Sequence, residues 1–293
     1  MPRKRATSLT ELQQITKPLF SDDGYKKGLA LKLRATDIVI APFSKSGTTW
    51  TQQIVHTLRT RGSIDFDDIS RVVPWIETST SLGLDLNAEQ QAHPRAFKSH
   101  LPFDLIPKGG RYINILRDFG DAAVSLFNFY EGWFLEPGSV PVDEFVEAQL
   151  FRRDGYYRHL LSWWPNRSSP NTLFLTYEFM KESLPKAVAQ IANFIDVDLD
   201  DELLEITLEH ASLPFMLSHQ HRFDDALMRK RSEEVCNLPE GSSSSKIHKG
   251  RIGARTELKK ETLKKIDNVW RDQITPKLGF NNYNELLTEL RNR

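Results

Sequence analysis

The chain of 293 residues carries 39 Lys and Arg and 39 Asp and Glu, so its formal net charge is zero. Apolar residues make up 39% and charged residues 27%, which is ordinary for a globular protein. A neutral protein is poorly suited to coating nucleic acid or an acidic membrane with its whole surface. We therefore expect no nucleic-acid partner, although a balanced total leaves room for one concentrated basic pocket.

The sequence carries no signal for a membrane span or for secretion. No apolar run reaches the roughly 18 residues that a spanning helix needs, and the basic residues 1–5 lead into polar sequence instead of an apolar signal core. We expect a cytoplasmic protein without a membrane span. The single cysteine, Cys236, has no partner for a disulfide or a zinc site, and we expect its role to be structural.

Apolar, β-branched runs alternate along the chain with segments of helical spacing. The expected strands are residues 37–41, 95–99, 111–116 and 172–177. The clearest expected helices are residues 48–59, 141–152, 184–195 and 257–273. This alternation predicts an α/β fold, a parallel sheet flanked by helices. No linker divides the chain before residue 230, so we expect a single domain over residues 1–293.

Charge is distributed unevenly along the chain. Residues 196–209 hold seven acids and no Lys or Arg, whereas residues 246–293 hold twelve Lys or Arg against six acids. Two solvated faces would explain both segments; alternatively, part of the basic tail closes over an anion. Residues 225–250, which include a Gly-Ser run at 241–245, are expected to form a flexible lid over such a ligand.

The loop after the first strand has the features of an anion-binding site. The strand runs into PFSKSGTTW (residues 42–50), where helical spacing begins. The free N–H groups and the positive dipole at a helix start favour an anion. Lys45 adds a mobile charge, and Ser46, Thr48 and Thr49 add hydroxyl donors. These features predict phosphate binding, with an incidental strand–turn–helix as the alternative.

The spacing of this loop separates the possible phosphate ligands. A triphosphate loop reads GxxxxGK[ST], with Lys directly after the last Gly. Here Lys45 precedes Gly47 and the first Gly is absent, which disfavours ATPase or kinase chemistry. The run KSGTTW (residues 45–50) instead resembles the 5′-phosphosulfate loop of the cytosolic-type sulfotransferases.

Further segments resemble motifs of this family and follow the family's order. They are KSHLP (98–102), RDFGDAAVS (117–125), Tyr177 with Glu178, HASLPFM (210–216) and HKG (248–250). Two of them depart from the family pattern: the adenine segment has Ala211 for Thr and Leu213 for Phe, and His248 replaces an Arg. The matches span residues 42–250, most of the chain.

The resemblance implies that a sulfuryl group moves from 3′-phosphoadenosine 5′-phosphosulfate (PAPS) to a hydroxyl or amine of a small molecule, leaving PAP, with no metal required. It places the 5′-phosphosulfate on Lys45, Ser46, Gly47, Thr48 and Thr49. It places the 3′-phosphate on Arg117, Ser125, His248, Lys249 and Gly250. It places the adenine on Trp50, Tyr177, Ser212, Leu213 and Met216. Arg117 would otherwise pair with Asp118 or Asp121, and Trp50 and Met216 would otherwise be core.

The resemblance also implies catalytic roles. Lys45 would stabilise the bridging oxygen on which charge builds, and Lys98 would neutralise the sulfuryl oxygens. His100 would be the general base, because a neutral imidazole accepts a proton near neutral pH. The family further implies that Ser125 hydrogen-bonds Lys45 in the empty enzyme.

The acceptor pocket is the least defined part of this interpretation. By alignment to the family Phe129 falls on a pocket position, and Trp75, Trp133 and Phe134 are expected walls, with plain core as the alternative for each. Aromatic walls favour a flat phenol or steroid-like acceptor. The family's dimerisation pattern is not visible in residues 255–268, so a homodimer stays open. The alternative functions are a catalytically silent nucleotide-binding protein and a nucleoside or nucleotide kinase.

Overall fold

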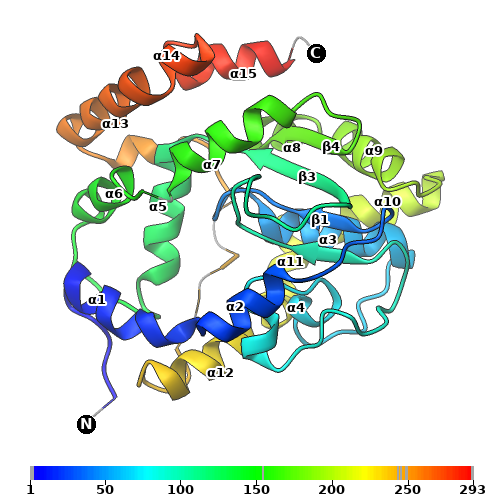
Figure 1. Cartoon of the computed structure of the whole chain (residues 1–293), viewed down its shortest axis with the longest axis horizontal. Coiled ribbons are helices and arrows are strands. Elements are labelled where there is room, and N and C mark those ends of the chain that lie inside the picture. Colours follow the sequence, from blue (N-terminus) through cyan, green and yellow to red (C-terminus); the bar gives the residue numbers. More distant parts are fainter. Residues whose placement is uncertain (1–2, 154, 243, 245, 248–249, 292–293) are drawn as a thin grey trace.

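A parallel sheet lies at the centre of the molecule (Figure 1). The computed structural model describes the chain except for residues 1–2, 154, 243, 245, 248–249 and 292–293. The described strands of the sheet are β1 (Ile38–Ile40), β2 (Ala96–Lys98), β3 (Arg111–Leu116) and β4 (Thr172–Thr176). Their order is β2-β1-β3-β4 and every pairing is parallel. The predicted α/β fold is therefore confirmed.

Helices precede, separate and follow the strands. The α-helices are α1 (Leu9–Thr16), α2 (Asp22–Leu29), α3 (Thr48–Thr60), α4 (Ile69–Val72), α5 (Phe119–Tyr130), α6 (Val142–Leu150), α7 (Tyr156–Trp163), α8 (Tyr177–Glu182), α9 (Leu184–Phe194), α10 (Asp201–His210), α11 (Leu213–Ser218), α12 (Ala226–Val235), α13 (Lys260–Gln273), α14 (Thr275–Leu278) and α15 (Tyr283–Arg291). Short 3-10 turns cover η1 (Lys17–Leu19), η2 (Ser79–Leu82), η3 (Trp164–Asn166), η4 (Gln220–Arg222) and η5 (Ala254–Glu257).

Apolar side chains line both faces of the sheet, as expected of strands buried between two helical layers. Ile38, Ile40, Ile113 and Ile115 pack in one cluster with side chains of α3, α9 and α10. Val39, Phe97 and Tyr112 point to the opposite face and pack in another cluster with Trp163 of α7. Helix α13, orange in Figure 1, packs against α6 and α5.

The predicted helix over residues 257–273 starts later in the structure. Residues Ala254–Glu257 form a 3-10 turn, and Leu258 is extended with φ −79° and ψ 149° before α13 begins at Lys260. The Asp143 carboxylate accepts a hydrogen bond of 2.9 Å from the N–H of Lys259 at the start of this helix. This contact with α6 helps to set where α13 begins. The local spacing of apolar residues carries no information about it.

Because all four strands are parallel, their carboxyl ends lie at the same edge of the sheet. Lys45 follows β1, His100 follows β2, Arg117 follows β3 and Tyr177 follows β4. Across that edge the residues therefore stand in the order His100, Lys45, Arg117, Tyr177, which is the strand order. Open α/β sheets bind ligands at this edge, because the loops and helix N-termini converge there.

Candidate functional site

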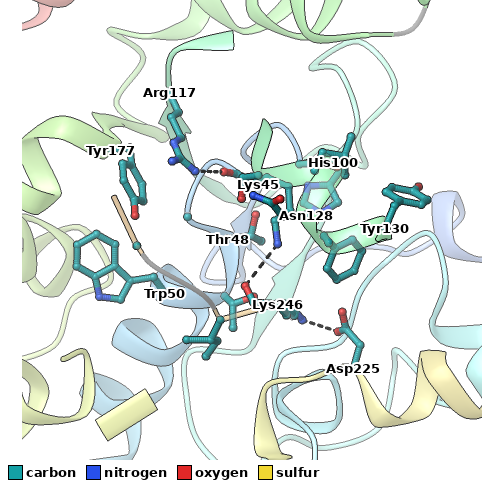
Figure 2. A pocket seen from close by; sticks show the side chains of 18 of the residues that line it. Lys45, Thr48, Trp50, His100, Arg117, Asn128, Tyr130, Tyr177, Asp225 and Lys246 are labelled. Carbon is teal, nitrogen blue, oxygen red and sulfur yellow. Dashed lines mark hydrogen bonds and ion pairs between the residues drawn. The ribbon is translucent and has the colours of Figure 1, made fainter. Parts of the chain in front are cut away.

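A cavity of about 340 Å³ lies at this edge (Figure 2). Its lining includes Lys45, His100, Arg117 and Tyr177, so each strand contributes to it. In Figure 2, Trp50, Tyr177 and Arg117 lie on one side of Lys45, and His100, Tyr130 and Asp225 lie on the other. The cavity therefore has two halves with Lys45 between them.

The loop that carries Lys45 has the backbone of an anion cradle. Gly47 has φ 95° and is the N-cap of α3, and Lys45 has φ 64°. The positive φ favours glycine at position 47, and a Cβ there would also press against the Tyr177 ring at 3.1 Å. Within the described chain, the buried hydroxyl oxygens of Ser46 and Thr48 have no hydrogen-bond partner. Together with the free N–H groups of the first helical turn, these unpartnered hydroxyls fit the oxygens of a phosphate.

Lys45 is half-buried and lies among several other positive charges. Burial lowers its pKa to about 7; Lys246, Arg117 and Lys98 push in the same direction, and Asp225 opposes them. The Nζ atom donates a long hydrogen bond of 3.4 Å to the Lys246 carbonyl and lies 4.4 Å from the centre of the Phe129 ring. An anionic ligand would relieve the repulsion between these cations.

Lys98 and Trp75 form a second cationic position beside the cavity. The Nζ atom of Lys98 lies 3.9 Å from the centre of the Trp75 ring. Burial lowers the pKa of Lys98 to about 8, and Lys246 adds to the effect. Trp75 also stacks edge-on against His100, with ring centres 5.2 Å apart. The Trp75 ring therefore contacts, and helps to position, both Lys98 and His100.

His100 is neutral, and a backbone contact selects its tautomer. Its Nδ1 atom lies 2.8 Å from the Pro42 carbonyl, which only accepts hydrogen bonds, so Nδ1 carries the proton and Nε2 is left as an acceptor. Burial first, and then Lys98, hold the pKa of His100 well below its ordinary value of 6.5. The Glu77 carboxylate accepts a bond of 2.7 Å from the His100 N–H and fixes the backbone.

Arg117 connects the loop to the C-terminal segment. Its Nη1 atom donates to the Lys45 carbonyl at 2.7 Å and its Nη2 atom to the Arg251 carbonyl at 2.9 Å. The guanidinium lies 4.3 Å from the centre of the Tyr177 ring, and Nε has no partner among the described residues. The alternative pairing of Arg117 with Asp118 or Asp121 is wrong.

The two acids instead bind the C-terminal segment. Asp118 pairs with Arg255 at 2.9 Å. The Asp121 carboxylate accepts hydrogen bonds of 2.8 Å from the N–H groups of Gly253 and Arg255. These contacts hold the chain after residue 250 against the start of α5 and leave the Arg117 guanidinium facing the cavity.

Of the residues that we expect around an adenine, all but Ser212 line the cavity. Trp50 lines the cavity, donates to the Ala211 carbonyl at 2.8 Å and lies edge-on to Tyr177. Leu213 and Met216 also line it, although Met216 belongs equally to the core cluster of α3 and α9. Ser212 does not line the cavity, because its hydroxyl caps α11 by accepting from the Phe215 N–H.

The four expected acceptor-pocket residues all line the cavity: Trp75, Phe129, Trp133 and Phe134. Trp133 and Phe134 stack with ring centres 4.6 Å apart and are also almost fully buried in a core cluster, so they serve both roles. The Trp133 indole N–H donates to the Ser232 hydroxyl of α12 at 2.9 Å. Helix α12, the first part of the expected lid, is thus anchored to the pocket wall.

Most of the predicted site residues meet in this one cavity. The lining includes Gly47, Thr48, Thr49, Lys98, Ser125 and Gly250 besides those described above, whereas Ser46 is fully buried and does not line the cavity. His248 and Lys249 lie outside the described residues. The expected bond from Ser125 to Lys45 is wrong for the described structure, because the Lys45 ammonium donates to the Lys246 carbonyl instead.

Several lining residues were not anticipated from the sequence. They are Leu19, Phe20, Leu126, Asn128, Tyr130, Lys181, Asp225, Met228, Lys246, Ile247, Arg251, Ala254 and Glu257. Asn128 and Tyr130 lie on the same helix as Phe129, so helical adjacency was the available signal. Lys246 and Arg251 lie close in sequence to the HKG segment, and both line the cavity, so part of the basic tail faces it.

Three further findings concern other classes of site. None of the helices in the described part of the chain is long and apolar enough to cross a membrane. Among the described residues, no three His, Cys, Asp or Glu side chains lie together as a metal site would require. Cys236 is buried, and burial raises the pKa of its thiol to about 11, which suppresses the reactive thiolate.

Known proteins resemble this chain over most of its length. A family model described as "Sulfotransferase domain" matches residues 35–279. Sulfotransferase 1B1 of Canis lupus familiaris is 34% identical over 198 residues, covering 62% of this chain and 67% of that protein. Sulfotransferase 1E1 of Homo sapiens is 32% identical over 201 residues, covering 64% and 68%.

Solved structures share the fold. Retinol dehydratase in complex with androsterone and inactive cofactor PAP superposes with a TM-score of 0.70 at 22% identity, covering 93% of this chain and 95% of that chain. Mouse sulfotransferase SULT7A1 complexed with PAP superposes with a TM-score of 0.66 at 21% identity, covering 87% and 90%.

Proposed function

This chain belongs to the sulfotransferase family, whose members transfer a sulfuryl group from PAPS to small acceptors, and we propose that it does so through Lys45, Lys98 and His100. One observation carries the assignment of residues. His100, whose Nδ1 is paired with a carbonyl and whose Nε2 is left as an acceptor, shares one cavity with Lys45, Lys98 and a loop whose Ser46 and Thr48 hydroxyls have no partner among the described residues. A base and an anion site are thus juxtaposed, as transfer of an anionic group to a hydroxyl requires.

The residues divide the chemical work in this proposal. The acceptor oxygen forms a bond to sulfur while the bond from sulfur to the bridging phosphate oxygen breaks. That oxygen keeps the electron pair and leaves with PAP, and the acceptor proton goes to Nε2 of His100. Lys45 stabilises the bridging oxygen, and Lys98 neutralises the sulfuryl oxygens, since cations fixed in a dry site stabilise charge that develops on oxygen.

The donor is proposed to lie on the side of Lys45 that carries Trp50, Tyr177 and Arg117 (Figure 2). The loop N–H groups with Ser46, Thr48 and Thr49 would hold the 5′-phosphosulfate. Arg117 and Ser125 would hold the 3′-phosphate together with Gly250, and the sequence adds His248 and Lys249 to that set. The unpartnered Arg117 Nε supports this placement, because a buried guanidinium N–H lacks a partner until an anion supplies one.

The acceptor is proposed to lie on the other side, against aromatic walls. Phe129 lies under the Lys45 ammonium and Trp75 under the Lys98 ammonium, so a flat ring packed against these two would bring its hydroxyl toward both lysines and His100. Two solved structures of retinol dehydratase, which shares the fold, hold androsterone and retinol, both apolar alcohols. A phenol or an apolar alcohol is therefore the proposed acceptor class.

The experiment that tests this function is incubation with sulfur-labelled PAPS and a panel of phenols, apolar alcohols and amines, without added metal. We expect labelled product from phenols or apolar alcohols. Thermal shift with PAP and ATP provides a second readout, and we expect PAP to stabilise the protein more. Donor binding without any product would favour a silent nucleotide-binding protein, and greater stabilisation by ATP would favour a nucleotide kinase.

A further inference from the structure

A buried ion pair lies inside the cavity, apart from the residues assigned above. Lys246 Nζ donates to Asp225 Oδ1, and both side chains are only 7% exposed. Both residues line the cavity. They come from opposite ends of the segment 225–250, which the sequence alone predicts to be a lid. In Figure 2 the pair lies on the acceptor side, below Lys45 and His100.

A buried ion pair of this kind is expected to add little net stability to the fold. Burying two charges costs several kcal/mol per ion before their attraction is counted, and a well-packed apolar pair is often as stable. Asp225 also has φ 56°, in the left-handed region that few non-glycine residues occupy. Near Asp225, a different pair, Asp224 with Arg229 at 2.9 Å, already connects the ends of the turn that starts α12. We therefore expect the Lys246 charge to act in ligand binding and not in the stability of this turn.

The charge of Lys246 acts on both lysines of the proposed transfer site. Among charged neighbours it has the largest influence on Lys45 and also on Lys98, and it contributes to the environment of His100. Its backbone carbonyl lies 3.4 Å from Lys45 Nζ. Three ammonium groups thus surround one part of the cavity, and Asp225 is the carboxylate that opposes all of them.

We propose that Lys246 is a third cationic contact of the transferring sulfuryl group, beside Lys45 and Lys98, and that Asp225 is the positioning residue that holds it there. This inference rests on the proposed function. The sulfuryl group has three non-bridging oxygens that share negative charge, so more than one donor is needed to match it. The ion pair with Lys246 also offsets the negative charge of the Asp225 carboxylate, which would otherwise repel an anion in the cavity.

Binding of two ligands that differ only in the sulfuryl group tests the contact without any turnover. We expect Lys246→Met to weaken PAPS binding about tenfold at pH 6, where the lysines are charged, and to change PAP binding less than threefold, as measured by calorimetry. Lys246→Arg should restore most of the preference for PAPS. Lys230→Met, on the exposed face of α12, is the matched control and should leave both affinities unchanged.

The pH dependence of PAP binding distinguishes an electrostatic role of Lys246 and Asp225 at the site from a general effect on the stability of the fold. The groups facing Lys45 and Lys98 are Lys246, Asp225, Arg117, Glu77 and Asp68, together with each other. Loss of the cation in Lys246→Met raises the pKa of both lysines, so PAP binding should weaken at higher pH than in the unaltered protein. Loss of the anion in Asp225→Asn lowers those pKa values, so binding should weaken at lower pH. A simple loss of stability would not shift the two profiles in opposite directions.

The outcomes distinguish this inference from the proposed function. If the unaltered protein binds PAP and transfers sulfuryl groups, but Lys246→Met weakens PAPS and PAP equally or not at all, the third contact is wrong. If Asp225→Asn still weakens PAPS binding about tenfold in a Lys246→Met background, Asp225 does not act through Lys246. If the unaltered protein binds neither PAPS nor PAP, it is the proposed function that fails.

Discussion

The Pro42 carbonyl accepts a hydrogen bond from Nδ1 of His100 at 2.8 Å, and this bond joins the anion-binding loop to the proposed base. Pro42 is the first residue of the loop that carries Lys45, and His100 follows the neighbouring strand β2. The bond fixes the tautomer, because a carbonyl cannot donate. The same loop that would hold the donor therefore also leaves Nε2 of His100 free for the acceptor proton.

Replacement of His100 tests its role as the base. We expect His100→Ala to lower kcat by about 10²–10⁴-fold, the usual contribution of a general base, with PAP affinity nearly unchanged because His100 lies on the other side of Lys45 (Figure 2). Steady-state kinetics and calorimetry measure the two effects. His221→Ala, which removes an exposed imidazole, is the control. A variant that keeps the original rate would exclude His100 as the base.

Donor affinity should fall as the pH rises through neutrality. Burial first, then Lys246, lower the pKa of Lys45 to about 7, so its ammonium is charged below pH 7 and loses its proton above it. We expect PAP to bind up to about tenfold more weakly for each pH unit between 7 and 8, since one proton is linked to binding. Lys45→Arg should flatten this profile, because a guanidinium stays charged. A flat profile for the unaltered protein would contradict the prediction.

Arg117 should decide whether the 3′-phosphate is recognised. Comparing PAP with AMP, which lacks that phosphate, isolates this contribution. We expect Arg117→Gln to reduce the preference for PAP over AMP at least about tenfold, because hydrogen bonds to charged groups contribute about 1.5–3 kcal/mol. Arg255→Gln serves as the control, since Arg255 pairs with Asp118 and does not line the cavity. If both variants lower the preference equally, Arg117 acts through the fold alone.

The stability of the fold should depend on the buried ion pair between Arg95 and Asp37, which joins the segments just before β2 and β1. Arg95 Nε donates to Asp37 Oδ1 at 2.9 Å, and the side chains are 3% and 0% exposed, respectively. We expect Arg95→Met to lower the free energy of unfolding by about 3–5 kcal/mol, because it leaves a buried carboxylate without its partner. Urea unfolding measures this change. The exposed Arg61 provides the control, and Arg61→Met should leave the unfolding midpoint unchanged. An equal, small effect of both would show that the buried pair is dispensable.

The fold and the donor side of the site could largely be predicted from the sequence. Each strand is a short apolar run, and a motif begins at or just after its end. The predicted positions of β1 and β3 therefore place Lys45 and Arg117 at the carboxyl ends of these strands, within a few residues. Such relationships are local. The backbone at Gly47, the N-terminus of α3 and the apolar spacing behind them all depend on residues within one or two turns.

The rest required the tertiary structure, because it depends on which distant residues are brought together. Asp225 and Lys246 are separated by α12 and a loop, and nothing in their local sequence indicates that they form a buried pair beside Lys45. The partner of Lys45 is likewise the Lys246 carbonyl and not the family-implied Ser125. The sequence thus determined the sheet and the loop after β1 by local pattern, and it indicated the candidate base through the resemblance of KSHLP to a family motif. Only the tertiary packing of Asp225 and Lys246 beside Lys45 decided how charge is arranged around them, since buried charges interact through space and not through sequence.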